Sequence, residues 1–407
     1  MTIFDRRNET MRPDLVEQVQ LERLQALLAR LRRNVRRYAD IVGDTQIDSL
    51  SDVSRLPFTT PDDLVSAFPY GMFALPLREV IRLHSNVGPG GKQLVCGYTN
   101  NDLIQWGRLT ARQLVAAGVT SNDVLQIGFG DGFLAHSLGF MLGAELIEAS
   151  VIPEDTSHIE YQLQVLGSYR TTVLITTPTN AAELVDLLHA TKTDAQSLHL
   201  RSVILTRPVP AGLREDLETG LFARVQCCFG IPEITNPGFC VECEHGRFHV
   251  NEDQFLVEIH EGELVVTTLS REAMPLLRYR TQVACSLQRG KCSCGRTGAM
   301  VTPGDRLDGQ LRVREMPLYE GQVADVLDKT EAAGQPFSLE ISDKEVAISI
   351  EMSQRLFGDQ MRLLADLREQ IRSEFRTRLG IPAVVRYVAP MSSVEERDLP
   401  GQPASEG

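Results

Sequence analysis

The chain has 407 residues, more than a single hydrophobic core normally supports, so at least two domains are expected. Hydrophobic residues make up 43% and charged residues 23% of it, a composition typical of a folded globular protein. The formal net charge of -13 disfavours a nucleic-acid surface, because binding to phosphates requires a basic field. We therefore expect no nucleic-acid partner.

The N-terminal segment carries no targeting signal that we can identify. No apolar stretch reaches the length that a bilayer requires, and "MTIFDRRNETMRPD" lacks the apolar centre of a signal peptide. The basic run "RLQALLARLRRNVRRYAD" places leucines at helical spacing and arginines on the other faces, which is typical of a solvated helix. We expect a cytoplasmic protein with no membrane partner.

The first half of the chain predicts helices followed by an α/β pattern. Thr60 can cap a short helix that Pro61 opens within "SRLPFTTPDDLVSAFP". From residue 80 to about residue 234, strand-like runs alternate with helical patterns: "VIRLHS", "DVLQIGFG", "LIEASVIP", "TTVLITTP", "SVILTRP" and "RVQCCFG". This alternation predicts a largely parallel sheet covered by helices on both faces, with ligands bound at the carboxyl ends of its strands.

The pattern changes after Pro237. Short alternating strands in "FHVNEDQFLVEIH" and "GELVVTTL" predict a small antiparallel subdomain. Beyond "TPGDRLDGQLRV", two strands, a helix over about 359–379 and a last strand "AVVRYVAP" predict a small α+β domain. We therefore expect an α/β protein with a large N-terminal domain over residues 1–306 and a small C-terminal domain over residues 307–407.

The clearest chemical signal is a cluster of cysteines. Eight cysteines are too few for a disulfide scaffold in a chain of this length, yet five lie between Cys240 and Cys294. Cys240 and Cys243 form a C-x-x-C pair, His249 follows, and Cys292 and Cys294 form a C-x-C pair. Such donors on two turns suit a tetrahedral structural zinc site that joins loops over about 240–297. Four ligands are needed, and we favour Cys243, His249, Cys292 and Cys294. The alternative is that the cysteines are reduced and pack as small hydrophobes.

A glycine-rich loop lies within "RLHSNVGPGGKQLVCGYT". Glycines allow backbone N–H groups to approach an anion closely, although Pro89 removes one donor. The spacing is not that of the G-x-x-x-x-G-K-[ST] loop. Taken alone, the segment fits either a surface turn or a phosphate-binding loop.

Three further segments resemble the phenylacetate-coenzyme A ligases, a family of the adenylate-forming superfamily. They are "SRLPFTTPDDLVSAFPYGMFALP", "GELVVTTLSREAMPLLRYRT" and "KCSCGRT", and the similarity runs in order from about residue 10 onward. Members of this family adenylate an aryl-acetic or related acid with ATP and magnesium. Their small domain then rotates, and the acyl group passes to the thiol of coenzyme A.

The resemblance assigns roles to the glycine-rich loop and to the turn "CFGIPE". Gly88, Gly91 and Lys92 match the family's phosphate loop, whereas Pro89 and Gly90 replace its hydroxyl-bearing residues. Phe229 and Gly230 match the start of an aromatic-Gly-x-Ser/Thr-Glu turn, which implies that Phe229 stacks on adenine. Glu233 then binds magnesium, Arg306 of "GDRLDG" lies on the ribose side, and Glu233 and Lys92 are the catalytic candidates.

Other positions depart from the family's nucleotide site. Leu205 of "LTRP" stands where the family leaves room for adenine, and Pro232 lacks the hydroxyl of the turn. Val283 replaces an aspartate that accepts hydrogen bonds from both ribose hydroxyls. The sequence ends at "PASEG", without the lysine that follows this motif in the family. Loss of such a charge typically costs about 3 to 4 kcal/mol in the transition state.

The family's aryl-acid pocket corresponds to "GFGDGFLAHSLGFMLGA". Phe129, Phe133 and His136 are the pocket candidates, although His136 also fits a histidine near a helix start. Asp131 is unusual beside a substrate carboxylate and can instead cap the helix.

The resemblance predicts an adenylate-forming ligase that activates an aromatic or heteroaromatic carboxylic acid and loads it onto coenzyme A or an acyl carrier protein. ATP and magnesium are then its cofactors besides zinc, and a homodimer is conceivable. The alternative is a degenerate pseudo-ligase that binds an acyl ligand or a protein partner without ATP. A third reading keeps only acyl transfer between two thioesters.

Overall fold

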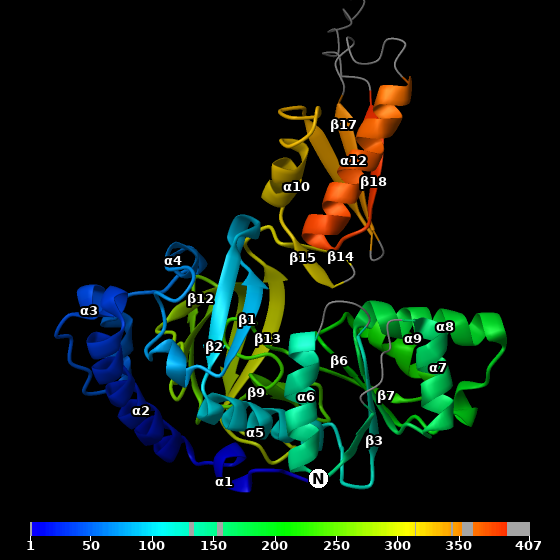
Figure 1. Cartoon of the computed structure of the whole chain (residues 1–407). Helices are drawn as coiled ribbons and strands as arrows, with labels where there is room; N and C mark the ends of the chain where they lie inside the picture. Colours follow the sequence, from blue (N-terminus) through cyan, green and yellow to red (C-terminus); the bar gives the residue numbers. More distant parts are fainter. Residues whose placement is uncertain are drawn as a thin grey trace, which may run out of the picture. The chain divides into compact units, whose positions relative to one another are not determined.

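The structure is a computed structural model that describes residues 2–129, 134–152, 158–313, 315–342, 345–351 and 361–388. The chain divides into two compact units, Met1–Gln310 and Leu311–Gly407 (Figure 1). In these described ranges, no helix is long and apolar enough to cross a membrane. Each unit has its own hydrophobic core.

A five-stranded parallel sheet lies within the large unit, in the order β4-β3-β5-β6-β7. Its strands are β3 (Val124–Gly128), β4 (Ser150–Ile152), β5 (Val173–Thr176), β6 (Ser202–Leu205) and β7 (Arg224–Cys227). Every residue of β5 and β6 is buried, because both faces of the sheet are covered. This burial explains why their sequences are continuous apolar runs.

Helices cover both faces of the parallel sheet, α5 and α6 on one side and α7, α8 and α9 on the other (Figure 1). They are α5 (Asn100–Ala116), α6 (Leu134–Leu146), α7 (Ile159–Ser168), α8 (Pro178–Thr191) and α9 (Ala211–Leu221), with a 3-10 turn η4 (Ala195–Ser197). Gly139 lets α6 approach α5 closely, since a Cβ there would lie 2.6 Å from Cζ2 of Trp106. The arrangement confirms the predicted α/β class.

Helices at the N-terminus pack against the antiparallel part of the same unit. They are α1 (Arg6–Glu9), α2 (Pro13–Asn34), α3 (Arg36–Val42) and α4 (Pro61–Ser66), with the 3-10 turns η1 (Leu50–Arg55) and η2 (Leu77–Glu79). The leucines at helical spacing in α2 are buried, which confirms the predicted amphipathic helix. Thr60 caps α4 by accepting a hydrogen bond from the Asp63 amide, and Pro61 is its first residue, as predicted.

The glycine-rich loop joins the two strands of an antiparallel hairpin, β1 (Arg82–Val87) and β2 (Gln93–Tyr98), through the 3-10 turn η3 (Pro89–Gly91). The run "VIRLHS" was expected to belong to the parallel sheet, and this expectation is wrong. A parallel connection needs a crossover of about a dozen residues or more, whereas only five residues separate Val87 from Gln93.

A six-stranded antiparallel sheet follows in the order β10-β11-β12-β13-β9-β8, which confirms the predicted change of pattern after Pro237. Its strands are β8 (Cys240–Glu242), β9 (Phe248–Val250), β10 (Phe255–His260), β11 (Glu263–Thr268), β12 (Tyr279–Arg289) and β13 (Ala299–Arg306). Along β12, buried and partly exposed residues alternate over the first seven positions, as in a strand with one covered face.

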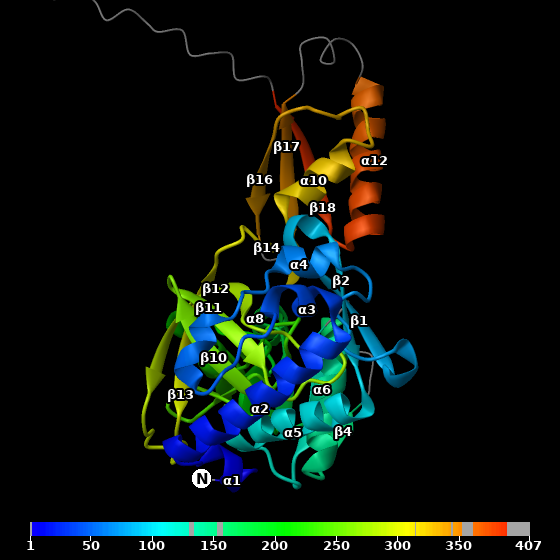
Figure 2. The same ribbon diagram turned by 90° about the vertical axis from the view of Figure 1, so that its left-hand side faces the viewer.

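The small unit contains the predicted β-α-β arrangement. Its elements are β14 (Leu311–Val313), β15 (Met316–Leu318), α10 (Glu320–Leu327), β16 (Phe337–Ile341), β17 (Val346–Glu351), α12 (Met361–Leu379) and β18 (Ala383–Val388). β17 and β18 are parallel neighbours, and α12 connects them (Figure 2). Phe375 and Ile371 of α12 are fully buried against this sheet's core.

The Tyr38 hydroxyl joins α3 to the chain before β12. It lies 2.8 Å from the Thr59 hydroxyl and accepts a hydrogen bond from the Leu277 amide at 3.2 Å. Because the side chain is fully buried, Tyr38→Phe leaves the Leu277 N–H without a partner. We expect the free energy of unfolding in urea to fall by about 1 to 3 kcal/mol. The exposed Tyr70→Phe is the control, with an expected change below about 0.5 kcal/mol; equal losses would contradict this role for Tyr38.

Candidate functional site

The four favoured metal ligands come together between two turns of the antiparallel sheet. Their donor atoms all lie within 4.8 Å of one another, and all four residues are buried. The Sγ atoms of Cys243 and Cys292 are 3.9 Å apart, and Sγ of Cys294 is 3.5 Å from Nε2 of His249. Three thiols and one imidazole in this arrangement can hold a tetrahedral ion.

Cys240 lies outside this group. It is fully buried on β8, where burial, together with the nearby Cys285 thiol, raises its pKa well above the ordinary value. It therefore stays protonated and packs as a small hydrophobic residue. Cys227 and Cys228 are buried as well, as expected for core positions.

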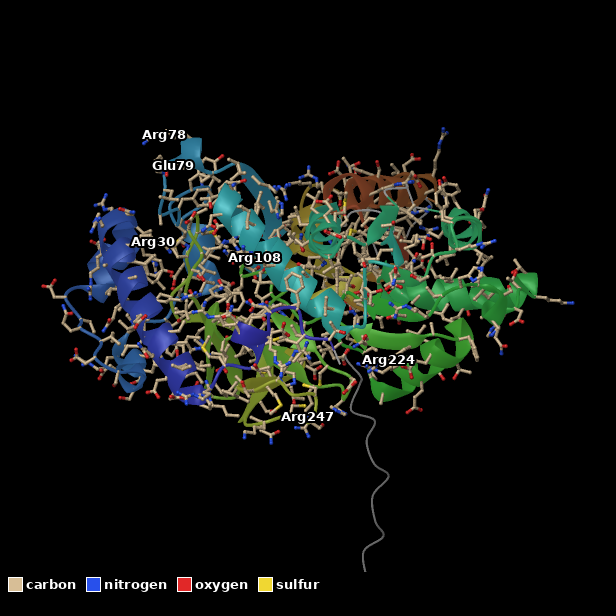
Figure 3. The ribbon with its side chains drawn as sticks, turned by 90° about the horizontal axis from the view of Figure 1, so that it is seen from below. Arg30, Arg78, Glu79, Arg108, Arg224 and Arg247 are labelled. Carbon is tan, nitrogen blue, oxygen red and sulfur yellow. The ribbon has the colours of Figure 1, made fainter. Side chains whose placement is uncertain are left out.

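Tight turns present the cysteines. In the first, Gly246 adopts a φ of +68° and its amide donates to the Cys243 carbonyl at 2.9 Å. In the second, Gly295 adopts a φ of +88° and donates to the Cys292 carbonyl at 3.0 Å. The first turn is also held by Arg224, labelled in Figure 3, whose Nη2 donates to the Glu244 carbonyl at 3.1 Å.

The protonation states of the cluster suit metal binding. Burial, and then the charges of Arg296 and Arg247, lower the pKa of His249 to about 4, so its imidazole is neutral. Burial raises the pKa of Cys243 to about 11. Burial acts in the same direction on Cys292, yet hydrogen bonds from the Cys294 backbone and from neighbouring side chains lower its pKa below the ordinary value. A divalent ion would bind here with release of thiol protons.

The glycine-rich loop is a closed turn. The Gly88 amide donates to the Lys92 carbonyl at 2.8 Å, and the Gly91 amide donates to the Gly88 carbonyl at 3.0 Å. Gly90 and Gly91 adopt φ values of +63° and +78°. A Cβ on Gly88 would lie 2.9 Å from the Leu94 side chain, so packing alone requires glycine there. The side chain of Lys92 is exposed.

Glu233 and Arg306 lie in one electrostatic cluster with Asp308. Glu233 is 9% exposed within a turn that the Ile231–Thr235 bridge closes. The pKa of Glu233 is raised, chiefly by burial and to a smaller extent by the charge of Asp308. A hydrogen bond to its own backbone and the charge of Arg306 act in the opposite direction. Arg306 is held by Asp308, with Nε 3.0 Å from Oδ1. Two of the predicted nucleotide residues, Glu233 and Arg306, thus interact electrostatically, and their roles in nucleotide binding stay predictions.

Phe229 does not present an open ring face to a nucleotide. It is 6% exposed and contacts Phe239 and Phe248 with ring centroids 5.8 Å and 6.1 Å away. Leu205 is fully buried at the end of β6, and Val283 is 6% exposed. Val283 pairs directly with Arg306 across β12 and β13.

The predicted acyl pocket is described only in part. Phe129 is buried and contacts Phe140, with ring centroids 6.0 Å apart. Phe133 and Asp131 lie outside the described residues. His136 belongs to α6, and its side chain lies outside the described part as well.

Two features escaped the sequence analysis. Asp308 follows Arg306 by two positions in "GDRLDG", and this spacing could have identified the ion pair. The second is an aromatic cluster on the hairpin itself: the His84 ring of β1 lies 4.7 Å from the Tyr98 ring of β2, and Arg271 stacks over Tyr98 at 4.0 Å. Arg271 is far away in the sequence, so no local pattern reveals this contact.

Solved structures share this fold. The chain is similar in structure to 2-hydroxyisobutyryl-CoA ligase in complex with 2-HIB-AMP and CoA. The TM-score is 0.85, with 20% identity over 97% of this chain and 90% of that chain. The chain is also similar to the amide bond synthetase McbA from Marinactinospora thermotolerans, with a TM-score of 0.54 and 15% identity over 80% and 67% of the two chains. The fold is that of the adenylate-forming ligases.

Sequence comparison defines the family. The chain is 30% identical to the phenylacetate-coenzyme A ligase of Thermus thermophilus over 94% of both chains, and 30% identical to that of Escherichia coli over 93% and 92%. No protein-family model matches it. The chain belongs to the phenylacetate-coenzyme A ligase family, which confirms the predicted resemblance and the predicted class of enzyme, an acid–thiol ligase.

The partly buried His84 predicts a pH dependence of stability. Burial, then the charges of Arg82 and Arg271, lower the pKa of His84 from 6.5 to about 4. The folded state favours the neutral His84 ring. The resulting contribution to the free energy of unfolding is fully present above about pH 6.5 and is lost as the pH falls toward 4. We expect His84→Phe to flatten the fall in the free energy of unfolding over this range, measured by urea denaturation. His199→Phe, at an exposed position, controls for loss of a histidine; equal flattening in both variants would refute the expectation.

Proposed function

We propose that this chain activates a small aromatic carboxylic acid as an acyl-adenylate and transfers the acyl group to the thiol of coenzyme A. The observation that carries the proposal is the buried Glu233 carboxylate, which interacts electrostatically with the Arg306–Asp308 ion pair. A carboxylate can bind the magnesium ion that accompanies a nucleotide, and an arginine fixed nearby can form hydrogen bonds to the nucleotide itself. The relatives' names supply the substrate class, and phenylacetate is the probe we choose.

The turn around Gly230 explains how Glu233 is presented. A Cβ on Gly230 would lie 2.7 Å from Oδ1 of Asn236 and 2.7 Å from the Thr235 carbonyl. Glycine therefore permits the tight return of the chain in the turn that carries Glu233. We assign Glu233 to the magnesium ion that accompanies ATP, because hard carboxylate oxygens are preferred ligands for it. Phe229 supports this turn from the core.

Polar contacts to the ribose must come from neighbours of Val283, since valine accepts no hydrogen bond. Arg306 lies opposite Val283 on the adjacent strand, and Asp308 holds its guanidinium. We assign binding of the ribose to Arg306 and Asp308. Lys92, exposed on the hairpin turn, is assigned to the phosphates, with Gly88 and Gly91 shaping the turn.

Acid-dependent exchange of pyrophosphate into ATP tests adenylation. With phenylacetate and ATP-magnesium, we expect exchange in the wild-type chain and about a hundredfold less in Glu233→Gln, because a charge aimed at the reacting nucleotide is lost. Glu244→Gln, an exposed glutamate beside the metal turn, is the control. Exchange at the level of Glu233→Gln in the wild-type chain, over a panel of aryl acids, would contradict the proposal.

A second candidate is a pseudo-ligase that binds an acyl ligand or protein partner without ATP. Two observations favour it: the closed turn in which the Gly88 and Gly91 amides donate internally, and the burial of Val283 and Leu205. Calorimetry with ATP-magnesium separates the two functions, since the pseudo-ligase shows no binding heat. A micromolar dissociation constant excludes it.

Val283→Asp should strengthen ATP binding. The introduced carboxylate can accept a hydrogen bond from each of the two ribose hydroxyls. Hydrogen bonds to a charged acceptor contribute about 1.5 to 3 kcal/mol each. We expect the Kd for ATP, measured by calorimetry, to fall by at least about tenfold, or 1.4 kcal/mol. Adding Lys92→Ala should cancel part of this gain for ATP and leave adenosine binding unchanged. An equal effect of Lys92→Ala on both ligands would show that the loop is only a turn.

We also propose that Cys243, His249, Cys292 and Cys294 hold one structural zinc ion. The support is the convergence of four buried donors of the type that zinc prefers. No position is left for substrate, so the ion would stabilise the two turns rather than take part in the reaction.

Elemental analysis tests this site. After dialysis we expect about one zinc per chain, and Cys292→Ser should remove it and lower the Tm, because the binding free energy of a structural ion is part of the folding free energy. Cys240→Ala is the matched control, since Cys240 is buried nearby but lies outside the cluster, and should retain zinc. A zinc-free wild-type chain would disprove the assignment.

A further inference from the structure

A small, partly enclosed cavity lies beside the proposed metal ligand His249. Its volume is about 20 Å³, enough for one water molecule. Six parts of the large unit line it: helices α1, α2 and α5, strand β8, strand β9 with the loop after it, and the turn that follows Cys294. The polar residues lining it are Asn8, Glu9, Arg112, His249, Asn251, Glu252, Asp253, Arg296 and Thr297.

Several nitrogen atoms of the residues that line this cavity are buried and have no hydrogen-bond partner among the described residues. They are Nη1 and Nη2 of Arg296, Nε of Arg112 and Nδ1 of His249. The Arg296 side chain is only 1% exposed, so its two free amino groups cannot reach bulk solvent. With Nε2 of His249 bound to the proposed metal ion, the neutral ring would carry its proton on Nδ1, which is then a donor. The unpartnered atoms are therefore all hydrogen-bond donors.

The charges around the cavity decide what fills it. Arg112 and Arg296 contribute two positive charges, and Asp5, Glu9 and Asp253 bind them directly. An anion would add negative charge to a site where carboxylates already balance the guanidinium groups. Water is neutral, accepts two hydrogen bonds and donates two. Glu9 has acceptor capacity left, since its Oε1 takes the Asp5 amide at 2.8 Å and its Oε2 takes Nε of Arg296 at 2.7 Å.

We infer that one buried water in this cavity links Nδ1 of His249 to Arg296 and Glu9, and that these two residues position the metal ligand. The inference rests on the proposed zinc site. Ligating histidines commonly donate their second N–H to a fixed acceptor, which orients the ring and strengthens its bond to the metal. Within the part of the chain that the structure describes, no group accepts a hydrogen bond from Nδ1 directly, so the water completes the link.

The same residues dock the N-terminal segment onto the metal turn. The Thr297 amide donates to the Glu9 carbonyl at 3.3 Å, and the Thr297 hydroxyl donates to the Met11 carbonyl at 2.6 Å. The Arg296 amide in turn lies 3.4 Å from Sγ of Cys294. Metal retention and docking of α1 are therefore coupled through one buried ion pair, Glu9–Arg296.

The rate of zinc transfer to a chromogenic chelator tests the inference in the full-length zinc-loaded protein. Glu9→Gln should release zinc at least tenfold faster than the wild-type chain, a loss typical of the partners of ligating histidines. Glu263→Gln is the matched control, because Glu263 is equally buried and binds an arginine, Arg280, away from the metal. It should lower the Tm to a similar extent without changing the release rate.

A second pair of variants keeps the test valid if Glu9→Gln does not fold. Arg296→Lys removes the two free amino groups and should also speed release, whereas Arg280→Lys should not. If Glu9→Gln released zinc no faster than Glu263→Gln, and Arg296→Lys no faster than Arg280→Lys, the positioning role of Glu9 and Arg296 would be overturned. A crystal structure with an empty cavity would overturn the water link. A zinc-free wild-type chain is a different result, because it refutes the metal site itself and the inference with it.

Discussion

The large unit depends on one buried cation, the guanidinium of Arg112 in α5. It binds both carboxylate oxygens of Asp253, at 2.7 Å and 3.0 Å, and also Asp5, at 2.7 Å. The side chains of Arg112 and Asp253 are 4% and 3% exposed. Three segments far apart in the sequence, the N-terminus, α5 and the loop before β10, therefore meet at one point. Removing a single partner from such a pair typically costs about 3 to 5 kcal/mol, because the other charge stays buried.

The segments that Arg112 holds together also carry or contact residues of both candidate sites. Asp5 belongs to the segment that carries Glu9, whose contact with Arg296 positions the turn of Cys292 and Cys294. Strands β9 and β13 pair next to that turn, and β13 ends at Arg306 of the nucleotide cluster. The proposed metal and the proposed nucleotide contacts thus share one antiparallel sheet. A structural ion at one end would help to hold the strand that ends at Arg306.

The sequence alone predicted what local patterns encode. The continuous apolar runs of β5 and β6, the cap at Thr60 and the convergence of four of five metal donors follow from periodicity and spacing. It failed for the hairpin of β1, because a short apolar run looks alike in parallel and antiparallel strands. The aromatic contact between His84 and Tyr98, the buried Arg112 and the cavity beside His249 depend on distant residues, which no local pattern records.

The central claim, that an acyl-adenylate forms, is tested most directly by oxygen transfer. Phenylacetate with both carboxylate oxygens replaced by oxygen-18 is turned over with ATP-magnesium and coenzyme A, and the nucleotide product is analysed by mass spectrometry. In an adenylate, one carboxylate oxygen bonds to the α-phosphorus and stays there when the thiol displaces AMP. We expect AMP that carries one oxygen-18 atom per molecule, formed together with phenylacetyl-coenzyme A. Unlabelled AMP, or ADP with labelled phosphate, would contradict the claim.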